Sequence, residues 1–344
     1  MKKTQPRLMP LVRDDRFYNS SDDVPESILI HTIPSFIQSL IGQKKRFPAN
    51  AHDWCVSSPV EDQTAELKIT WIGHSTFLIQ VGGFNILTDP IFGHPSFLFP
   101  RMLPAGISRE QLPRIDAIVV SHNHQDHLDL PSLEPFDNVP LLVPQGDKEW
   151  LRKKGFVKTQ EFMWWESTTF TGTHEGKEYQ ITCTFLPAVH WSARGLFDKN
   201  KSLWGSWMIS CNGQHVYFAG DTAFGSHFQA IGQEYEHITI ALLPIAPCKP
   251  SPGMLKSHMD VTQSVQAFID LKAERFIPMH WGTFAFGVDY FEEPIIALRQ
   301  LWHTHAHDLV AKELAILRAG EYVVIPSVPI TTQIPEVQTP AQLY

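Results

Sequence analysis

The sequence predicts an α/β fold in which two mixed β-sheets are flanked by helices. Short apolar runs of strand length gather in two separate parts of the chain, one starting at Leu67 and the other at Tyr179. Helical spacing of apolar residues appears after the second group, from about residue 261. Each sheet has an apolar face that must be buried, and two packed sheets covered by helices satisfy this requirement. The 43% hydrophobic content of the 344 residues is sufficient for one large core.

The first group of predicted strands leads into the most distinctive motif of the chain. Gly82 and Gly83 favour a hairpin turn between two of the strands. The run from Ile115 to Val120 is short, β-branched and apolar, which is typical of a buried strand. The predicted strands of this group are residues 67–73, 77–81, 85–88 and 115–120.

The second group contains another hairpin signal and is followed by a helix. Asn212-Gly213 favours a tight turn between strands. Asp260 is suited to cap a helix, and Gln263 three residues later completes a capping box. The predicted strands are residues 179–186, 205–211, 215–219 and 238–243, and the helix has apolar residues at 261, 265, 268 and 269.

We expect one large catalytic domain, residues 66–326, between two less regular ends. Residues 1–65 form an N-terminal extension that is polar and interrupted by prolines, except for the apolar stretch 28–41. Helical spacing after Pro34 indicates a short helix that packs on the core or faces a membrane. Residues 327–344 form a proline-containing C-terminal tail.

Composition excludes several function classes. The formal net charge of −8 argues against nucleic acid as a partner. The four cysteines are widely spaced without a CxxC pair, so we expect free thiols. We find no secretory signal peptide and no stretch of transmembrane length, and therefore expect a cytoplasmic or peripherally membrane-associated protein. Homodimer formation stays open.

One motif indicates hydrolytic metal chemistry. This motif is the run of three histidines and one aspartate within residues 122–127, and composition predicts only about 0.004 chance occurrences of it in a chain of this length. Imidazole and carboxylate ligands suit zinc and its neighbours, and a pair of such ions can activate water for a displacement reaction. The motif directly follows a predicted strand, where a rigid scaffold holds a reactive loop. Its metal-binding residues are His122, His124, Asp126 and His127.

Three further residues are candidates for the rest of a two-metal site. Each of them, His190, Asp221 and His280, follows an apolar run of strand type. Strand ends that meet at one edge of a fold bring such side chains together. The sequence therefore predicts a site assembled from four separate strand ends.

This arrangement resembles the metallo-β-lactamase superfamily, with its HxHxDH motif, a distant histidine, a Gly-Asp-Thr and a final histidine. Within it, the chain resembles the N-acylphosphatidylethanolamine-hydrolysing phospholipase D family over roughly residues 67–286. The resemblance implies an αββα sandwich of the metallo-β-lactamase type. The matching segments are Trp71-Ile-Gly-His-Ser-Thr76, Leu87-Thr-Asp-Pro-Ile-Phe92, Pro187-Ala-Val-His-Trp191, Leu203-Trp-Gly-Ser-Trp207, Gly220-Asp-Thr222 and His280-Trp-Gly-Thr-Phe284.

The resemblance also implies how the ligands are divided between two metal ions. One ion is expected to take His122, His124 and His190, the other to take Asp126, His127 and His280, with Asp221 bridging both. Two zinc ions per chain are expected, because zinc suits nitrogen and oxygen sites with an open position. Iron and manganese remain alternatives.

The implied reaction is hydrolysis of N-acylphosphatidylethanolamine to N-acylethanolamine and phosphatidic acid through a metal-bridging hydroxide. The expected catalytic residues are Asp126, Asp221 and His258, the last lying just before a helix start, where a phosphate is favoured. The phospholipid and, peripherally, the membrane surface are the expected partners. Arg194, Phe97 and Phe99 are further substrate-binding candidates, and His74 and Asp89 are expected to support the ligands.

Two other functions are compatible with the same motif. A related hydrolase acting on a lactone or a soluble phosphodiester shares the ligands but needs no acyl cleft. A non-catalytic, membrane-associated lipid-binding protein keeps the fold and loses turnover. The complete set of predicted ligands argues against the latter, and the aromatic stretch from Ile91 to Pro100 argues against the former.

Overall fold

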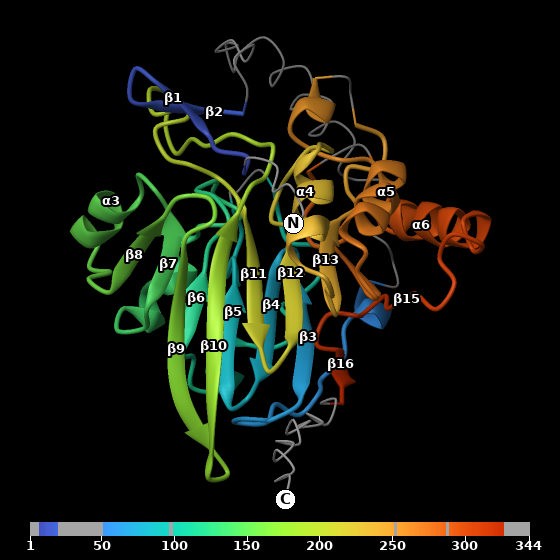
Figure 1. The fold of residues 1–344 in the computed structure, drawn as a ribbon, viewed down its shortest axis with the longest axis horizontal. Coiled ribbons are helices and arrows are strands. Elements are labelled where there is room, and N and C mark those ends of the chain that lie inside the picture. Colours follow the sequence, from blue (N-terminus) through green and yellow to red (C-terminus); the bar gives the residue numbers. More distant parts are fainter. Residues whose placement is uncertain (1–6, 20–50, 96–98, 251–252, 287–288, 327–344) are drawn as a thin grey trace, which may run out of the picture.

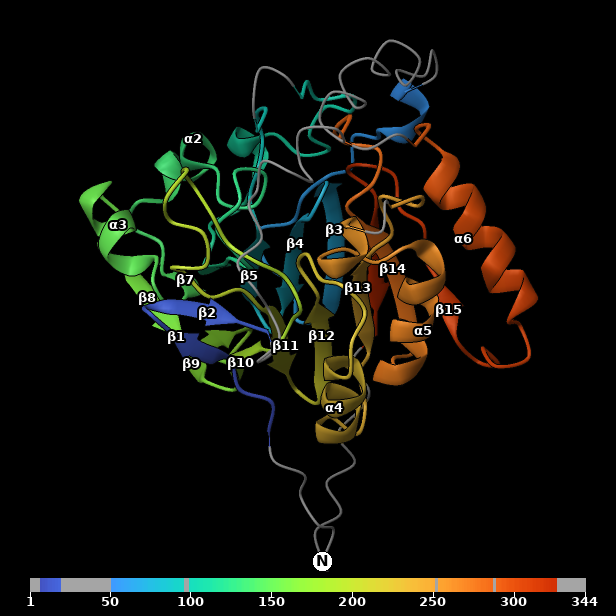
Figure 2. The same cartoon turned by 90° about the horizontal axis from the view of Figure 1, so that it is seen from above.

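The computed structural model describes residues 7–19, 51–95, 99–250, 253–286 and 289–326. Two seven-stranded mixed sheets pack face to face, and helices cover both outer surfaces (Figures 1 and 2). The predicted fold class, an αββα sandwich, is confirmed. The helix predicted within residues 28–41, the tail 327–344 and Phe97 all lie outside the described residues.

The first sheet contains the strands predicted around the HxHxDH motif. Residues 67–73 form β3 as predicted, and the bulge between Trp71 and Gly73 ends its regular pairing with β4. β7, β8 and β16 are additional strands, and the short β16 brings the end of the described chain back beside β3. In sheet order the strands are β16 (Tyr322–Ile325), β3 (Leu67–Gly73), β4 (Thr76–Val81), β5 (Phe84–Thr88), β6 (Ala117–Val119), β7 (Leu141–Pro144) and β8 (Thr159–Phe162).

The second sheet is antiparallel at one side and parallel at the other. β9 to β12 form an antiparallel meander, whereas β12 to β15 pair in parallel through crossovers. In sheet order the strands are β15 (Glu313–Leu314), β14 (Arg275–Met279), β13 (Ile240–Pro244), β12 (Gln214–Phe218), β11 (Ser206–Cys211), β10 (Lys177–Leu186) and β9 (Ser167–His174).

Helices form the outer layers (Figure 2). The predicted capping box is present, because the Asp260 side chain accepts from the Gln263 amide and starts α5. None of the described helices is both long and apolar enough to cross a bilayer. The helices are α2 (Leu130–Leu133), α3 (Lys148–Lys153), α4 (His227–Glu234), α5 (Val261–Leu271) and α6 (Glu293–Thr304), with 3₁₀ turns at Ala51–Trp54, Arg109–Gln111, Glu134–Phe136 and Met254–Lys256.

The core between the sheets is aromatic and reaches the strand ends. Trp207 on β11 is fully buried, stacks near Phe185, and donates its indole N–H to the Val120 carbonyl at 2.9 Å. Val120 directly precedes the segment that carries the HxHxDH motif. This indole therefore connects the second sheet to the start of residues 121–128, the segment with the candidate ligands, which we call the metal-binding loop.

The described part of the N-terminal extension packs on the core. Its hairpin consists of β1 (Leu11–Arg13) and β2 (Arg16–Tyr18), which form a separate two-stranded sheet (Figure 1). Phe17 is only 8% exposed, and its amide donates to the Asn200 carbonyl at 2.8 Å. Residues 7–19 are thus integrated into the domain.

Candidate metal centre

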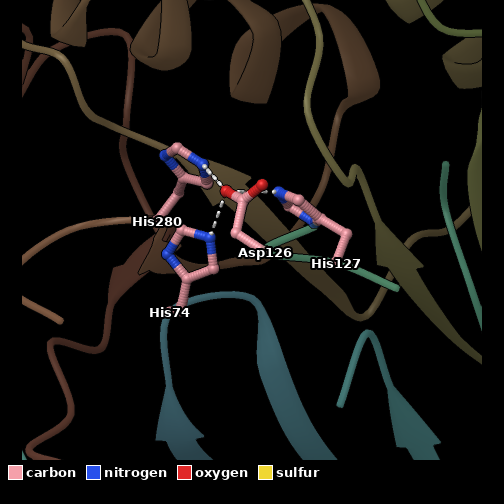
Figure 3. A group of neighbouring side chains, drawn as sticks. All are labelled: His74, Asp126, His127 and His280. Carbon is pink, nitrogen blue, oxygen red and sulfur yellow. Dashed lines mark hydrogen bonds and ion pairs between the residues drawn. The ribbon is translucent and has the colours of Figure 1, made fainter. Parts of the chain in front are cut away.

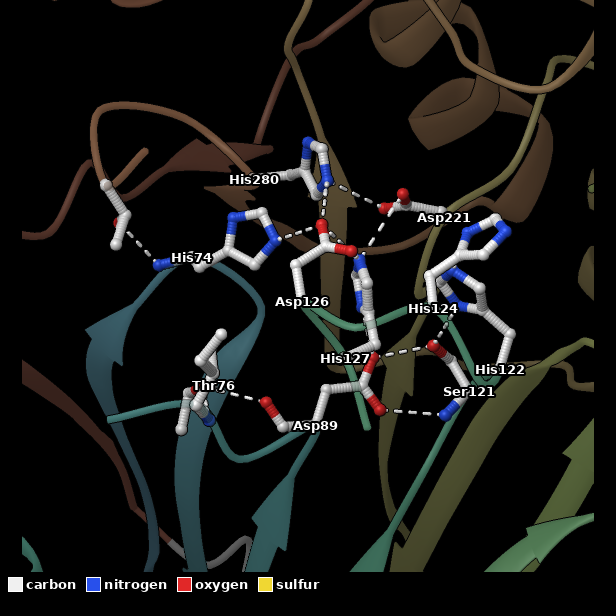
Figure 4. Close-up of polar contacts among 12 residues, drawn as sticks. His74, Thr76, Asp89, Ser121, His122, His124, Asp126, His127, Asp221 and His280 are labelled. Carbon is white, nitrogen blue, oxygen red and sulfur yellow. Dashed lines mark hydrogen bonds and ion pairs between the residues drawn. The ribbon is translucent and has the colours of Figure 1, made fainter. Parts of the chain in front are cut away.

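Loops from both sheets converge at one edge of the sandwich, where the candidate ligands meet (Figure 4). The HxHxDH residues follow β6, His190 follows β10, Asp221 follows β12 and His280 follows β14. The segment after β12 approaches the segment after β6 closely at Gly220. Gly220 has φ +58°, and a Cβ at this position would lie 2.3 Å from the Ser121 Cβ. Glycine is therefore required where β12 delivers Asp221 beside the metal-binding loop.

Three imidazoles form a first group, which we call the histidine site. His124 Nδ1 lies 2.8 Å from His122 Nε2 and 3.2 Å from His190 Nε2. Two nitrogens on a tetrahedral zinc ion, with Zn–N of ~2.0–2.1 Å, lie roughly 3.3 Å apart. The spacing and donor chemistry of the histidine site therefore fit zinc.

A second group brings His74, Asp126, His127 and His280 together (Figure 3), and we call the last three of them the mixed site. Asp126 Oδ2 lies 3.4 Å from His127 Nε2 and 3.8 Å from His280 Nε2. His74 also reaches this carboxylate, donating from Nε2 to Asp126 Oδ2 at 3.0 Å. His74 thus lies where it can orient Asp126, as expected for a residue that supports the ligands.

Asp221 lies against the mixed site and influences both sites. Its Oδ2 is 3.3 Å from His127 Nε2, and its Oδ1 is 3.2 Å from His280 Nε2. Its negative charge also acts on all three imidazoles of the histidine site. Asp221 therefore contacts two ligands of the mixed site, and its charge reaches the histidine site.

Buried ligand atoms without hydrogen bonds support occupation by a cation. Among the described residues, His124 Nε2, His127 Nε2, His280 Nε2 and Asp221 Oδ1 are buried and form no hydrogen bond, although the last three take part in the ion pairs given above. Such atoms are costly unless something else binds them, and a metal ion does so. The donor set therefore fits divalent metal ions.

The protonation states of the candidate ligands differ between the two sites. Burial and neighbouring imidazoles hold the pKa of His122 well below its usual value, which keeps the ring neutral. Burial opposes ionisation of Asp126 and Asp221, but the facing histidines outweigh it and lower both carboxyl pKa values. Burial likewise lowers the pKa of His280, yet the Asp221 and Asp126 carboxylates raise it to about 9. In the absence of metal, these carboxylates favour a protonated His280 imidazole. A metal ion that binds there would displace this proton.

Asp89 anchors the metal-binding loop from beneath (Figure 4). His127 Nδ1 donates to Asp89 Oδ2 at 2.6 Å, which leaves Nε2 free to face the mixed site. The Ser121 amide and hydroxyl both donate to the same carboxylate, at 2.7 and 2.6 Å. The expected supporting role of Asp89 thus has a specific geometry, that of a carboxylate–histidine pair behind a metal ligand.

Arg194 has a different placement from the phosphate contact that was expected. Its Nη1 donates to the Leu128 carbonyl at 2.5 Å and to the Asn123 carbonyl at 3.2 Å, and its guanidinium packs over Trp150. These backbone carbonyls belong to the metal-binding loop and engage the guanidinium. Arg194 therefore braces the loop.

A polar network that sequence patterns did not reveal holds the same loop. The Asp147 carboxylate accepts from the side-chain Nδ2 of Asn123 at 2.9 Å and from the Ser202 hydroxyl at 2.7 Å. Asn123 lies between His122 and His124, so this network fixes the backbone between two ligands. These residues lie at different places in the chain without a recognisable spacing, so no sequence signal marks them.

Asp147 predicts a pH dependence of stability. Burial raises its pKa from 3.8 to about 7, so the folded state favours the neutral carboxyl. The neutral Asp147 carboxyl contributes its full stabilisation to the folded state below about pH 4. This contribution is lost as the pH rises to about 7, because Asp147 ionises at lower pH in the unfolded chain than in the folded one. We expect Asp147→Asn to narrow the difference in unfolding free energy between pH 4 and pH 8, by up to about 4 kcal/mol. Urea unfolding of both proteins at the two pH values measures this, and parallel pH profiles would contradict it.

An apolar cavity of about 510 Å³ opens beside the two sites. Asp126, Asp221, His258 and His280 lie at its polar end. His258 Nδ1 lies 3.8 Å from Asp221 Oδ2. Phe99, one of the expected substrate-binding residues, lines the wall and packs against Phe286. The remaining wall is largely apolar and includes Met102, Trp191, Met254, Trp281, Phe284 and Phe291.

Comparison with known proteins identifies relatives over the part of the chain that carries the candidate ligands. A model of the beta-lactamase superfamily domain matches residues 84–281. The chain is 34% identical over 266 residues to N-acyl-phosphatidylethanolamine-hydrolyzing phospholipase D 1 of Caenorhabditis elegans, covering 71% of this chain and 74% of that protein. It is 36% identical over 244 residues to the mitochondrial N-acyl-phosphatidylethanolamine-hydrolyzing phospholipase D of Saccharomyces cerevisiae, covering 67% of this chain and 51% of that protein. The match therefore spans about half the length of the yeast protein.

Solved structures share the fold at lower identity. A metallo hydrolase from the archaeon Ignicoccus hospitalis aligns with a TM-score of 0.56 and 23% identity, over 76% of this chain and 98% of that one. An isothiocyanate hydrolase from Delia radicum gut bacteria aligns with a TM-score of 0.56 and 17% identity, over 76% of this chain and 100% of that one. At these identities the similarity shows the fold alone.

Proposed function

Since the chain belongs to the N-acylphosphatidylethanolamine-hydrolysing phospholipase D family of the metallo-β-lactamase superfamily, we propose that it hydrolyses N-acylphosphatidylethanolamine to N-acylethanolamine and phosphatidic acid. The observation that carries this proposal is the position of the metal centre at the polar end of an apolar cavity. A phospholipid has the same division, with a charged phosphodiester beside long acyl chains. The site and the substrate are therefore complementary in chemistry.

Two zinc ions are the proposed cofactors. His122, His124 and His190 would hold one ion, Asp126, His127 and His280 the other, and Asp221 would contact both. When bound, such a pair lowers the pKa of a water molecule and offsets negative charge on phosphoryl oxygens. The neutral imidazoles of the histidine site and the ionised carboxylates described above are protonation states that this binding requires, whereas a metal ion in the mixed site would displace the proton of His280.

The surrounding residues would position the reaction. Asp126 and Asp221 stay ionised and carry the negative charge of the site, while His74 and Asp89 orient Asp126 and His127. His258 faces the cavity, and burial lowers its pKa, so it is a neutral imidazole with a proton to donate to a phosphoryl oxygen. Water attacks phosphorus and loses a proton, the bond from phosphorus to the ethanolamine oxygen breaks, and that oxygen takes up a proton in exchange.

The membrane surface is the proposed source of the substrate, reached by peripheral association. The apolar side chains of Leu196 and Phe197 are 82% and 85% exposed in the loop that follows His190. Exposed apolar residues of this size suit insertion among lipid headgroups. Their exposure supports a surface that meets the bilayer.

Product analysis tests the proposed reaction. The purified protein is assayed for bound metal and incubated with N-acylphosphatidylethanolamine in mixed micelles, with both products followed by mass spectrometry. We expect both products from the parent protein and neither from Asp126→Asn. In ¹⁸O-labelled water, label is expected in the phosphate of phosphatidic acid; label in the ethanolamide hydroxyl would exclude attack at phosphorus. Bound metal without lipid turnover would favour a lactone or a soluble phosphodiester as substrate.

Met254 provides a test of the cavity's role. Met254 lines the wall, so Met254→Ser is expected to raise KM for long-chain substrate about tenfold, because burying a methionine side chain contributes about 1.5–3 kcal/mol. Turnover of a short-chain, water-soluble phosphodiester is expected to stay unchanged. Leu255→Ser is the matched control, since the adjacent Leu255 does not line the cavity. Equal KM values for parent and Met254→Ser would place the acyl chains elsewhere.

A further inference from the structure

We propose that Asn19, in the N-terminal hairpin segment, is a positioning residue for the candidate zinc ligand His190. This inference rests on the proposed metal centre and is independent of the lipid substrate. Residue 19 lies outside the region 84–281 that matches the superfamily domain. The N-terminal segment would then belong to the working metal site, although it contributes no ligand.

The side-chain amide of Asn19 forms hydrogen bonds with both backbone polar groups of His190. Its Nδ2 donates to the His190 carbonyl at 2.9 Å, and its Oδ1 accepts from the His190 amide at 3.2 Å. The same Oδ1 accepts from the Trp204 indole N–H at 2.9 Å. Because both peptide groups of His190 are held, the backbone orientation that directs its side chain is fixed.

A second contact fixes the ring of His190. Its Nδ1 donates to the Ser257 carbonyl at 2.7 Å, which turns Nε2 toward His124 Nδ1 at 3.2 Å. The side chain is 2% exposed and thus enclosed. The Ser257 carbonyl sets the rotation of the ring, and Asn19 sets the position of the backbone that carries it.

His190 needs this support more than the other two ligands of the histidine site do. His122 and His124 belong to one segment after β6, and the Asp147 network holds that segment. His190 comes from the other sheet, at the start of a connection that reaches β11 only at Ser206. Its distance from the other two ligands therefore depends on contacts outside its own strand.

The hairpin is itself secured to the loop that follows His190. The Phe17 amide donates to the Asn200 carbonyl at 2.8 Å, and the Asn200 amide donates to the Ser192 carbonyl at 2.7 Å. Arg16 donates to the carbonyls of Lys199 and Phe197. The segment from Arg16 to Asn19 therefore braces both ends of this loop and places Asn19 beside His190.

Zinc binding by Asn19→Ala tests the proposal. Each protein is loaded with zinc, dialysed against a graded chelator, and assayed for zinc per chain. We expect the parent to retain two ions and Asn19→Ala to lose one of them at 10–100-fold lower chelator strength. Cobalt substitution identifies the weakened site, because loss from the all-nitrogen histidine site and loss from the mixed site change the absorption spectrum differently. Asn19→Asp keeps the two acceptor contacts and is expected to show an intermediate loss.

Two controls separate positioning from a general effect on folding. Trp165→Phe removes the indole hydrogen bond to the Leu8 carbonyl, which tethers the far end of the segment, and is expected to leave zinc affinity unchanged. Thermal unfolding without metal is expected to be similar for parent and Asn19→Ala, while the zinc-induced rise in Tm becomes smaller. Unchanged zinc affinity, or a lower metal-free Tm with an unchanged zinc-induced rise, would overturn the role of Asn19. A parent protein that binds no zinc would overturn the proposed metal centre as well.

Discussion

Replacing Asp221 with asparagine is expected to lower kcat for N-acylphosphatidylethanolamine by about 10³-fold. Asp221 is 4% exposed and its two oxygens face His127 and His280. Asparagine keeps the shape but removes the negative charge that would contact both ions. Loss of about 4 kcal/mol of transition-state stabilisation corresponds to this factor.

Steady-state kinetics together with metal analysis measures the effect of Asp221→Asn. Asp308→Asn serves as the matched control, because Asp308 is exposed after α6 and pairs with the neighbouring His305 and His307. The control is expected to retain full turnover and both ions. Turnover of Asp221→Asn within tenfold of the parent would contradict a central role for this carboxylate.

Asp89→Asn is expected to weaken zinc binding 10–100-fold and to slow turnover correspondingly. Asp89 is fully buried, accepts from His127 Nδ1 and from both donors of Ser121, and touches no position that substrate would occupy. An amide at this position accepts fewer hydrogen bonds and no longer favours the tautomer with a proton on Nδ1. The Nε2 atom of His127 would then be unprotonated, and able to coordinate a metal ion, in a smaller fraction of the molecules.

A chelator competition at fixed pH measures the zinc affinity of Asp89→Asn. Asp116→Asn is a suitable control, because the Asp116 carboxylate accepts from the Asn85 amide and pairs with Arg114 without contacting a ligand. Retained zinc affinity in Asp89→Asn would show that the orientation of His127 is maintained by packing alone.

The residue pattern of this chain already contains its fold class and the identity of its candidate ligands. Short apolar runs of strand length indicate β3 and β4, and Asp260 with Gln263 marks the start of α5, because these signals depend on near neighbours in the chain. The HxHxDH run is similarly local. His190, Asp221 and His280 are recognisable because each directly follows an apolar strand.

Other features emerge only when distant segments meet. β16 is short and half-exposed, and it is defined by its pairing with β3 rather than by its own pattern. Arg194 is a surface-type residue in the sequence, yet the loop carbonyls that it binds lie more than 60 residues earlier in the chain. Asp147 and Asn19 reach the ligand segments in the same long-range way.

There is a physical reason why some features can be recognised in the sequence and others only in the tertiary structure. Ligand chemistry and strand formation follow from residue type and from contacts within a few positions, so they can be recognised along the chain. The orientation of each ligand follows from hydrogen bonds to buried backbone groups, and these must be satisfied by whichever polar side chains the packed sheets bring close. Asn19 and Asp147 supply such partners for His190 and Asn123 across separations that no local pattern encodes.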